Sequence, residues 1–376
     1  MVIGILKEPP GENRVSLFPE NVKQLIQLKA GVLVEKNAGF RAFTDDQDYE
    51  AAGATVGSRS DIFTEADLIL SIHPPAEADF PLIKKRTVWL GDYDPLFHLP
   101  LLKQFAASGL TVFSLDNIPR TTRAQSMDIR SSQANIAGYK AVLLAAYAYS
   151  RYFPMLMTAA GSIAPAKMLV LGAGVAGLQA VATGRRLGAV VEVFDTRPAV
   201  KEEVMSLGGK FIEVEGAADA SRAGGYAVEQ SADYSQKQQQ KIAESIARAD
   251  IVISTAQIPG KKAPVLVTKS MIDQMRSGSV IVDLAASTGG NTELTKDNDT
   301  VQYHGVTVIG NSNLPSEMPS DASKLYGKNV MNFLKLIIDK DGNLNLNFED
   351  ELVSGTCITH DGKITNERVK KFFGIE

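Results

Sequence analysis

A glycine-rich hexapeptide in the middle of the chain constrains its fold more than any other feature. The hexapeptide GAGVAG, residues 172–177, follows the apolar run 167–171 and opens a helical stretch at 175–187. The next apolar run, 190–194, ends at Asp195. An isolated G-x-G-x-x-G also occurs in ordinary strand–helix turns, but here strand, glycines, helix, second strand and acid stand in the order that a dinucleotide-binding βαβ unit requires. The sequence therefore predicts a Rossmann-type unit.

The three glycines and the acid have separate physical roles in such a unit. Gly172 allows a tight turn, Gly174 lets the backbone approach a pyrophosphate, and Gly177 lets the helix pack closely on the strand. The helix N-terminus would face the anion. Asp195 would bind the ribose hydroxyls and repel a 2′-phosphate, so NAD(H) is favoured over NADP(H). Arg197 is the one nearby residue that would weaken this preference.

Short apolar runs alternate with helical stretches along two blocks of the chain. The expected strands of the first block lie at 2–6, 32–36, 68–73, 87–90 and 110–115, and those of the second at 168–171, 190–194, 210–214, 250–254, 280–283 and 306–309. This alternation predicts parallel strands joined by crossovers. We expect an α/β protein with two doubly wound Rossmann-like domains, mostly parallel sheets, and long helices that join the domains.

The length of 376 residues also favours two domains. The first is expected at 1–128, completed by the C-terminal segment 316–376, in which an amphipathic helix spans 321–339. The second, at 129–315, would bind NAD(H). Within it, residues 216–236 show no sustained apolar period, and we interpret them as a long mobile loop that is either functional or disordered.

Charge and cysteine content exclude several classes of function. A net charge of −4 supplies no basic field for nucleic acid or anionic lipid. Cys357 is the only cysteine, so the chain has no disulfide partner within itself.

Residues 339–350 superficially resemble a calcium loop, but the glycine stands fourth instead of sixth, and a hairpin turn is expected there. We expect no metal site.

A polar segment at the expected domain junction, residues 119–132, is a candidate for holding a nicotinamide ring. A planar carboxamide needs paired donors and acceptors, which Gln125 and a mutually fixed Arg120–Asp128 pair would supply. Two serines, Ser131 and Ser132, would cap the helix that follows. A solvated charged turn explains the same residues without a ligand, and the residues alone leave both interpretations open.

The chain offers no evident group for handling a proton, which a substrate dehydrogenase needs as the hydride leaves. Its four histidines are His73, His98, His304 and His360. His73 and His98 lie near strand ends of the first domain and stay open as candidates, although capping or surface roles also explain them. Hydride transfer between two nicotinamide rings moves no proton at the reacting carbons, so such an enzyme needs no acid–base residue.

Nine segments together closely resemble the NAD(H)-binding component of proton-translocating nicotinamide nucleotide transhydrogenases. They are NRVSLFPE at 13–20, RAQSMD at 123–128, SQANIAGY at 132–139, MTAAG at 157–161, GAGVAG at 172–177, SLGGKF at 206–211, GGYA at 224–227, IPGK at 258–261 and VSGTC at 353–357. The resemblance extends over essentially the whole chain. It implies membership of the family that transhydrogenases share with alanine dehydrogenase.

The resemblance implies a set of site residues. By their match to the family's nicotinamide loop, Arg120, Gln125 and Asp128 are the expected catalytic residues. The expected NAD(H)-binding residues are Arg120, Thr121, Thr122, Gln125, Ser131, Gly172, Gly174, Val175, Ala176, Gly177, Asp195, Thr196, Arg197, Gly225, Tyr226, Gln238 and Gln257. Among them, Gly225 and Tyr226 match a mobile loop that folds over bound nucleotide.

The resemblance also implies partners. The chain is expected to form a homodimer that takes part in the Si/Re-specific type of proton-translocating NAD(P)⁺ transhydrogenase, with NADP(H) held as co-substrate on a separate beta component. Membrane-spanning subunits would couple the exchange to proton movement and hold the chain at the cytoplasmic face of the inner membrane. A non-catalytic NAD-sensing module is an alternative of a different class.

Alanine dehydrogenase is the enzymatic alternative. Those enzymes resemble this chain at Lys7, Glu8, Arg14 and the glycine hexapeptide, but they carry a substrate-binding lysine and a catalytic histidine after strands of the first domain. His73 and Tyr93 hold those places here, which argues against an amino-acid substrate. One further departure is Arg130, at a place usually apolar in relatives.

Overall fold

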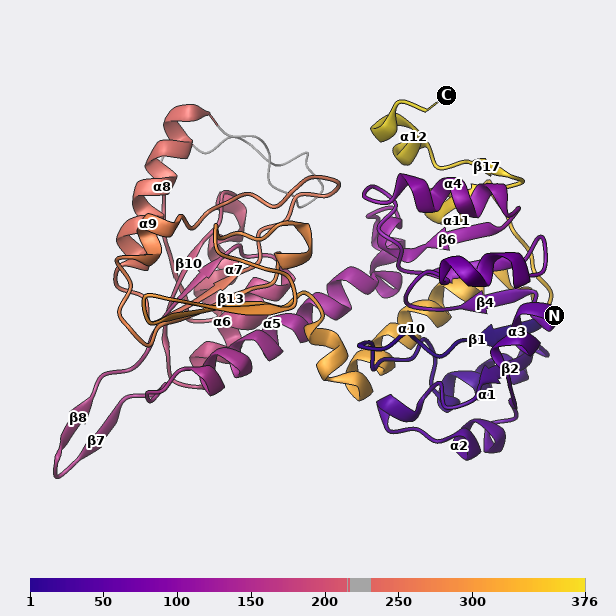
Figure 1. Ribbon diagram of the computed structural model, residues 1–376, viewed down its shortest axis with the longest axis horizontal. Coiled ribbons are helices and arrows are strands. Elements are labelled where there is room, and N and C mark those ends of the chain that lie inside the picture. Colours follow the sequence, from indigo (N-terminus) through magenta and orange to yellow (C-terminus); the bar gives the residue numbers. More distant parts are fainter. Residues whose placement is uncertain (215, 217–230, 376) are drawn as a thin grey trace. The chain divides into compact units, whose positions relative to one another are not determined.

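The structure, a computed structural model, describes residues 1–214, 216 and 231–375. These residues form two compact units, the first made of Met1–Gln133 with Pro315–Glu376 and the second of Ala134–Leu314 (Figure 1). The C-terminal segment thus belongs to the same unit as the N-terminus. Of the expected loop at 216–236, residues 217–230, including Gly225 and Tyr226, lie outside the described residues. The prediction is wrong for its last residues, because α8 (Ala232–Ile246) begins there.

Unit 1 contains a sheet with the strand order β17-β16-β6-β5-β4-β1-β2-β3. Its strands are β1 (Val2–Ile5), β2 (Gly31–Glu35), β3 (Thr55–Gly57), β4 (Leu68–Leu70), β5 (Val88–Gly91), β6 (Thr111–Ser114), β16 (Cys357–His360) and β17 (Lys363–Ile364). The strands from β6 to β3 are all parallel, and the C-terminal hairpin β16–β17 adds an antiparallel edge next to β6.

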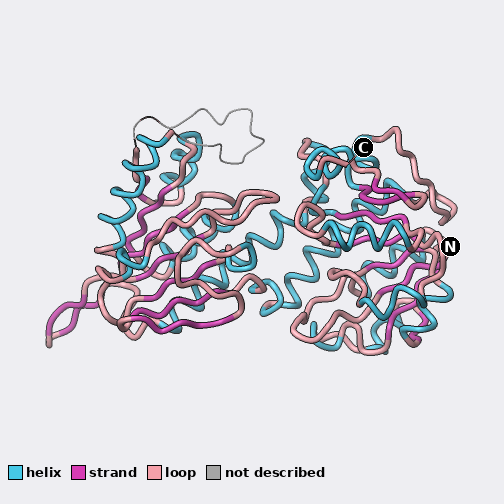
Figure 2. Tube along the Cα trace, turned by 45° about the horizontal axis from the view of Figure 1, so that its top comes forward, coloured by secondary structure: helices cyan, strands magenta, loops and turns pink. Residues whose placement is uncertain are grey.

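Helices cover both faces of the unit 1 sheet, as Figure 2 shows in cyan and magenta. They are α1 (Pro19–Gln27), α2 (Asp46–Ala51), α3 (Arg59–Glu65), α4 (Leu99–Ala107), α10 (Pro319–Ile337), α11 (Glu351–Thr356) and α12 (Glu367–Phe373), with short 3-10 turns that include η4 (Thr122–Met127). Alternating residues of one strand serve the two cores: Leu68 and Leu70 pack with Phe333 of α10, whereas Ile69 packs with Phe105 of α4.

Unit 2 contains a sheet with the order β11-β10-β9-β12-β13-β15-β14, in which only β14 is antiparallel. Its strands are β9 (Lys167–Leu171), β10 (Val190–Phe194), β11 (Lys210–Phe211), β12 (Ile251–Ser254), β13 (Val280–Asp283), β14 (Asp299–Tyr303) and β15 (Val306–Gly310). A separate hairpin of β7 (Leu156–Thr158) and β8 (Gly161–Ile163) extends away from this sheet (Figure 1).

The helices of unit 2 also lie on two faces. They are the later turns of α5 (Ile129–Ala148), α6 (Val175–Arg186), α7 (Lys201–Ser206), α8 (Ala232–Ile246) and α9 (Lys269–Ile272). Val170 of β9 packs with Ala145 of α5 and Val181 of α6, whereas Leu171 packs with Ile242 of α8. None of the helices formed by the described residues is both long and apolar enough to cross a membrane.

The connections of unit 2 create a switch point at its centre. From β9 the chain proceeds outward through β10 and β11, and it later returns to the other side of β9 to form β12 and β13. The segments that leave the carboxyl ends of β9 and β12 therefore diverge to opposite faces. In doubly wound sheets, ligands bind in the crevice at this position.

Candidate functional site

The glycine hexapeptide forms the turn between β9 and α6. Gly172 adopts a left-handed φ of +102°, and its N–H donates to the Phe194 carbonyl at 2.8 Å. A Cβ on Gly177 would stand 1.8 Å from the Gly172 oxygen, well inside van der Waals contact. A side chain at either position would break the turn, so the predicted steric roles of these two glycines match the geometry.

The N-terminus of α6 is built to receive an anion. Gly174 is the N-cap and has no side chain to accept from the first helical N–H groups, which have no acceptors within the helix. A Cβ placed on Gly174 would meet no other atom within 4 Å, so the space beside the N-cap is open. Exposed N–H groups at the positive end of a helix fit the pyrophosphate of a dinucleotide.

Asp195, at the end of β10, also holds the glycine turn in place. Its carboxylate accepts from the Ala173 N–H at 2.7 Å, from the Arg197 N–H at 2.8 Å, and from the Arg197 guanidinium at 2.9 and 2.7 Å. These donors engage both oxygens of a side chain that is only 8% exposed. Ribose hydroxyls would therefore share this carboxylate with Arg197, a competition that the sequence motif does not reveal.

The loop after β12 contacts the glycine turn. The Thr255 hydroxyl donates to the Gly172 carbonyl at 3.1 Å, and the Gln257 amide donates to the Leu284 carbonyl at 3.2 Å. On α8, Gln238 is buried. Tyr234 of the same helix lies near Asp195, and the pKa of its phenol is raised mainly by burial and further by the Asp195 carboxylate. Tyr234 was not among the residues predicted from the sequence.

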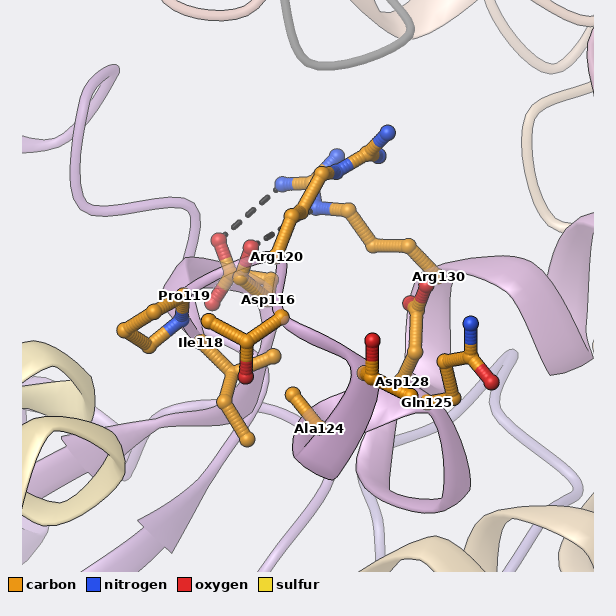
Figure 3. Close-up of a pocket in the computed structure, with 10 residues that line it drawn as sticks. Asp116, Ile118, Pro119, Arg120, Ala124, Gln125, Asp128 and Arg130 are labelled. Carbon is orange, nitrogen blue, oxygen red and sulfur yellow. Dashed lines mark hydrogen bonds and ion pairs between the residues drawn. The ribbon is translucent and has the colours of Figure 1, made fainter.

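A second group of predicted residues gathers in unit 1 around η4. This segment borders a cavity of about 270 Å³ (Figure 3). The cavity is lined by Asp116, Ile118, Pro119, Arg120, Thr121, Thr122, Ala124, Gln125, Asp128 and Arg130. The Thr121 hydroxyl is buried and has no hydrogen-bond partner among the described residues. A buried polar atom without a partner fits a cavity that takes a polar ligand such as a carboxamide.

Asp128 caps α5, and the prediction that Ser131 and Ser132 would do so is wrong, because both serines lie inside the helix. Its carboxylate accepts from the Ser131 N–H at 3.0 Å and from the Ser131 hydroxyl at 2.6 Å. Asn329 of α10 donates to the Ser126 carbonyl at 2.8 Å and accepts from the Ser132 hydroxyl at 2.7 Å. The C-terminal end of η4 is therefore held to α10, and Asn329 is a supporting residue that sequence patterns did not indicate.

Arg130 joins an acidic cluster at the carboxyl ends of β5 and β6. Its guanidinium pairs with Asp94 and, at 3.0 Å, with Asp116, as the dashed line in Figure 3 marks for Asp116. Carboxylate oxygens of Asp92, Asp94 and Asp116 lie within 4.8 Å of one another. Burial, and then the neighbouring carboxylates, raise the pKa of Asp92 to about 7. Arg130 thus supplies positive charge to a group of acids that would otherwise repel one another.

In unit 1, side chains of the chain itself link the segments that follow β1 and β4. The Glu8 carboxylate accepts from the N–H groups of Ile72 and His73 at 2.6 and 3.1 Å, and burial raises its pKa to about 7. Glu12 bonds Arg14 at 2.6 Å and His73 at 2.9 Å. Burial opposes the charged form of Glu12, but the hydrogen bonds from Arg14 and His73 outweigh it and hold the pKa well below its usual range. His73 is therefore engaged by a carboxylate of this chain.

The two doubly wound units and the glycine turn at the switch point define a protein of the Rossmann class. The domain family described as "Alanine dehydrogenase/PNT, N-terminal domain" matches residues 4–137, and the corresponding C-terminal domain family matches residues 141–367. The chain belongs to the alanine dehydrogenase/PNT family. This membership and the predicted fold class, with two mostly parallel Rossmann-like sheets, are confirmed.

Individual relatives agree with this assignment. A Rhodospirillum rubrum protein, named as the first part of NAD(P) transhydrogenase subunit alpha, is 46% identical over 376 residues, covering 97% of this chain and 98% of that protein. A transhydrogenase structure from Sinorhizobium meliloti matches with a TM-score of 0.88 and 46% identity over 97% of this chain and 100% of that one. An L-alanine dehydrogenase structure matches with a TM-score of 0.81 and 25% identity, covering 100% and 99% of the two chains.

Proposed function

We propose that this chain is the NAD(H)-binding component of a proton-translocating transhydrogenase and exchanges hydride directly with NADP(H) held on a separate component. The observation that carries the proposal is the 46% identity with a transhydrogenase alpha chain along nearly the full length of both proteins. The open N-terminus of α6 next to Gly174 supports it, because this geometry fits a dinucleotide pyrophosphate.

In this proposal unit 2 binds the nucleotide. The backbone at Val175, Ala176 and Gly177 receives the pyrophosphate, and Asp195, Thr196 and Arg197 receive the adenosine ribose. Gln238 and Gln257 line the crevice farther along. The bidentate Arg197–Asp195 pair partly neutralises the carboxylate. We therefore expect selection of NAD(H) to depend on Arg197 moving aside, so that Asp195 can accept the ribose hydroxyls.

Unit 1 would orient the nicotinamide ring. Arg120, Thr121, Thr122 and Gln125 border the cavity beside η4, and the Ser131 bonds fix the direction of the Asp128 carboxylate. Bound NADH supplies the hydride. Because the transfer needs no proton at the reacting carbons, these residues act by placing the ring instead of by acid–base catalysis.

The arrangement of Glu12 favours this reaction over alanine oxidation. An amino-acid dehydrogenase needs a cation to bind the substrate carboxylate and a base to accept a proton. In unit 1, Arg14 and His73 are both already bonded to Glu12. A substrate would have to displace a buried carboxylate of the chain itself.

The wider assembly belongs to the same proposal. We expect a homodimer that docks onto an NADP(H)-binding beta component and membrane-spanning subunits, in a complex of the Si/Re-specific type. The chain would then act at the cytoplasmic face of the inner membrane.

Mixing the purified chain with an NADP(H)-binding component from a relative tests the proposal. We expect NADH-dependent reduction of an NADP⁺ analogue that requires both proteins. Oxidation of NADH by pyruvate and ammonia, without exchange between nucleotides, would instead identify an amino-acid dehydrogenase. Binding of NADH without either reaction would favour a non-catalytic NAD-sensing module.

A further inference from the structure

Asn291 is a fully buried asparagine whose side chain clamps the loop after β12. Its Nδ2 donates to the carbonyls of Ala256 at 2.8 Å and Pro264 at 2.9 Å, and its Oδ1 accepts from the Ala256 N–H at 3.0 Å. The amide therefore bonds both backbone polar groups of Ala256, as a neighbouring strand would. With 0% exposure, it has no water to replace these partners.

The residue held by this clamp lies between two residues of the nucleotide crevice. On one side of Ala256, the Thr255 hydroxyl donates to the Gly172 carbonyl at 3.1 Å. On the other side, the Gln257 amide donates to the Leu284 carbonyl at 3.2 Å. Fixing Ala256 thus fixes both the support of the glycine turn and a predicted nucleotide-binding residue.

Asn291 is itself positioned by Asp283, the last residue of β13. The Asp283 carboxylate accepts from the Asn291 N–H at 2.6 Å, from the Thr295 hydroxyl at 2.6 Å and from the Ala285 N–H at 2.9 Å. These bonds engage both oxygens of a side chain that is 0% exposed. Asp283 stands at the carboxyl end of a strand, yet its hydrogen-bonding capacity is directed into the protein and not toward a ligand.

We propose that Asn291 is a positioning residue of the dinucleotide site, which acts through Ala256 and Thr255 to hold the loop after β12 against the glycine turn. The inference rests on the proposed binding of NAD(H) by unit 2. Asn291 lies outside every nucleotide-binding motif of the sequence, and we assign it an indirect effect on nucleotide affinity.

The chemistry of the clamp requires an amide. A carboxylate in its place would face the Ala256 and Pro264 carbonyls with no proton to donate, so Asn291→Asp replaces two attractive contacts by repulsion. An alanine leaves two carbonyls and one N–H without partners in a dry position. Both substitutions release Ala256, although their charges differ.

Unit 1 offers a matched control in Asn366. This asparagine is 3% exposed, donates to the carbonyls of Gly355 at 2.8 Å and Cys357 at 3.2 Å, and accepts from the Val369 N–H at 3.1 Å. It makes the same three kinds of main-chain bond as Asn291, but in the other unit. Asn366→Ala therefore reports the cost of removing such a clamp away from the glycine turn.

The test compares NADH affinity, measured by calorimetry, with thermal stability for the full-length wild-type chain, Asn291→Ala and Asn366→Ala. We expect similar losses of stability in the two variants, but a dissociation constant for NADH raised by about ten-fold or more only in Asn291→Ala. Faster hydrogen exchange at the amides of Thr255 and Ala256 without nucleotide should accompany it. Unchanged affinity in Asn291→Ala, or an equal loss in Asn366→Ala, would overturn the inference.

Thr255→Val keeps the test decisive if Asn291→Ala does not fold. Valine has nearly the shape of threonine, so this variant removes the bond to Gly172 and leaves the Asn291 clamp in place. We expect weaker NADH binding with little change in melting temperature, whereas wild-type affinity would exclude the connection through Thr255. A wild-type chain that binds no NADH would refute the proposed function itself, a result distinct from either variant's outcome.

Discussion

Substituting Gly174 by alanine separates folding from nucleotide binding. The backbone at Gly174 has φ −78° and ψ −172°, a conformation that alanine adopts readily, and the added methyl would meet no atom within 4 Å. The folded state therefore accommodates the change. Alanine restricts the unfolded chain, which stabilises the fold by about 0.4–1 kcal/mol, but it is a poorer N-cap than glycine by a similar amount, so we expect little change in stability.

The affinity for NADH, in contrast, should fall in Gly174→Ala. The methyl would stand at the N-cap of α6, the end of the helix at which we propose that the pyrophosphate binds. Losing one hydrogen bond to a charged group costs about 2 kcal/mol, which corresponds to a roughly thirty-fold higher dissociation constant for NADH. Calorimetric titration with NADH and a thermal melt of the same preparation measure the two effects.

Gly177→Ala is the contrasting variant. Its Cβ would stand 1.8 Å from the Gly172 carbonyl oxygen, so the turn has to open and both the melting temperature and NADH affinity should fall. Wild-type NADH affinity in Gly174→Ala would refute the reasoning, because it would mean that no ligand approaches the backbone there. A large loss of stability in that variant would contradict the open space beside the N-cap of α6.

Three further predictions concern unit 1. The stability of unit 1 should fall as the pH rises from 5 to 8, and thermal melts would measure this. Burial raises the pKa of Glu8 from 4.5 to about 7, so in this range the folded state keeps a proton that the unfolded state has lost. The resulting loss of stability is about 3 kcal/mol. Arg130→Leu should lower the melting temperature more at pH 8 than at pH 5, because nearby Asp92, whose pKa is raised to about 7, carries its charge at the higher pH. The control Arg123→Leu breaks an exposed ion pair with Asp350 and should leave the melting temperature nearly unchanged at either pH. Asp128→Asn keeps an oxygen that can cap α5, so the variant should fold. We expect it to slow hydride transfer, measured by stopped flow, more than it weakens NADH binding. Equal losses in the two measurements would count against an orienting role.

The elements of the fold could be predicted from the sequence because local rules determine them. Strands buried on both faces produce continuous apolar runs, such as the one that became β9, and the turn after it requires glycine at 172 and 177 for steric reasons. The hairpin turn expected within 339–350 likewise forms, with an antiparallel bridge between Ile338 and Leu344. The second hairpin, β7–β8, was not predicted, because its residues are largely exposed and carry no alternation of apolar and polar side chains.

Contacts between distant residues were beyond the reach of sequence patterns. The bond from Ala173 to Asp195 joins residues 22 positions apart, and the clamp of Asn291 on Ala256 spans 35. The grouping of Asp92 and Arg130 depends on how β5 packs beside β6. These contacts arise when the sheet assembles, and no local spacing in the sequence encodes them.

Isotope transfer tests the central claim most directly. NADH carrying deuterium at the reactive C4 position would be mixed with this chain, an NADP(H)-binding component and NADP⁺, and the NADPH formed would be analysed by mass spectrometry. Direct exchange between the two rings predicts that the deuterium appears in NADPH without dilution by solvent hydrogen. Formation of NADPH without the label, or of labelled alanine when pyruvate and ammonia are supplied, would contradict the account.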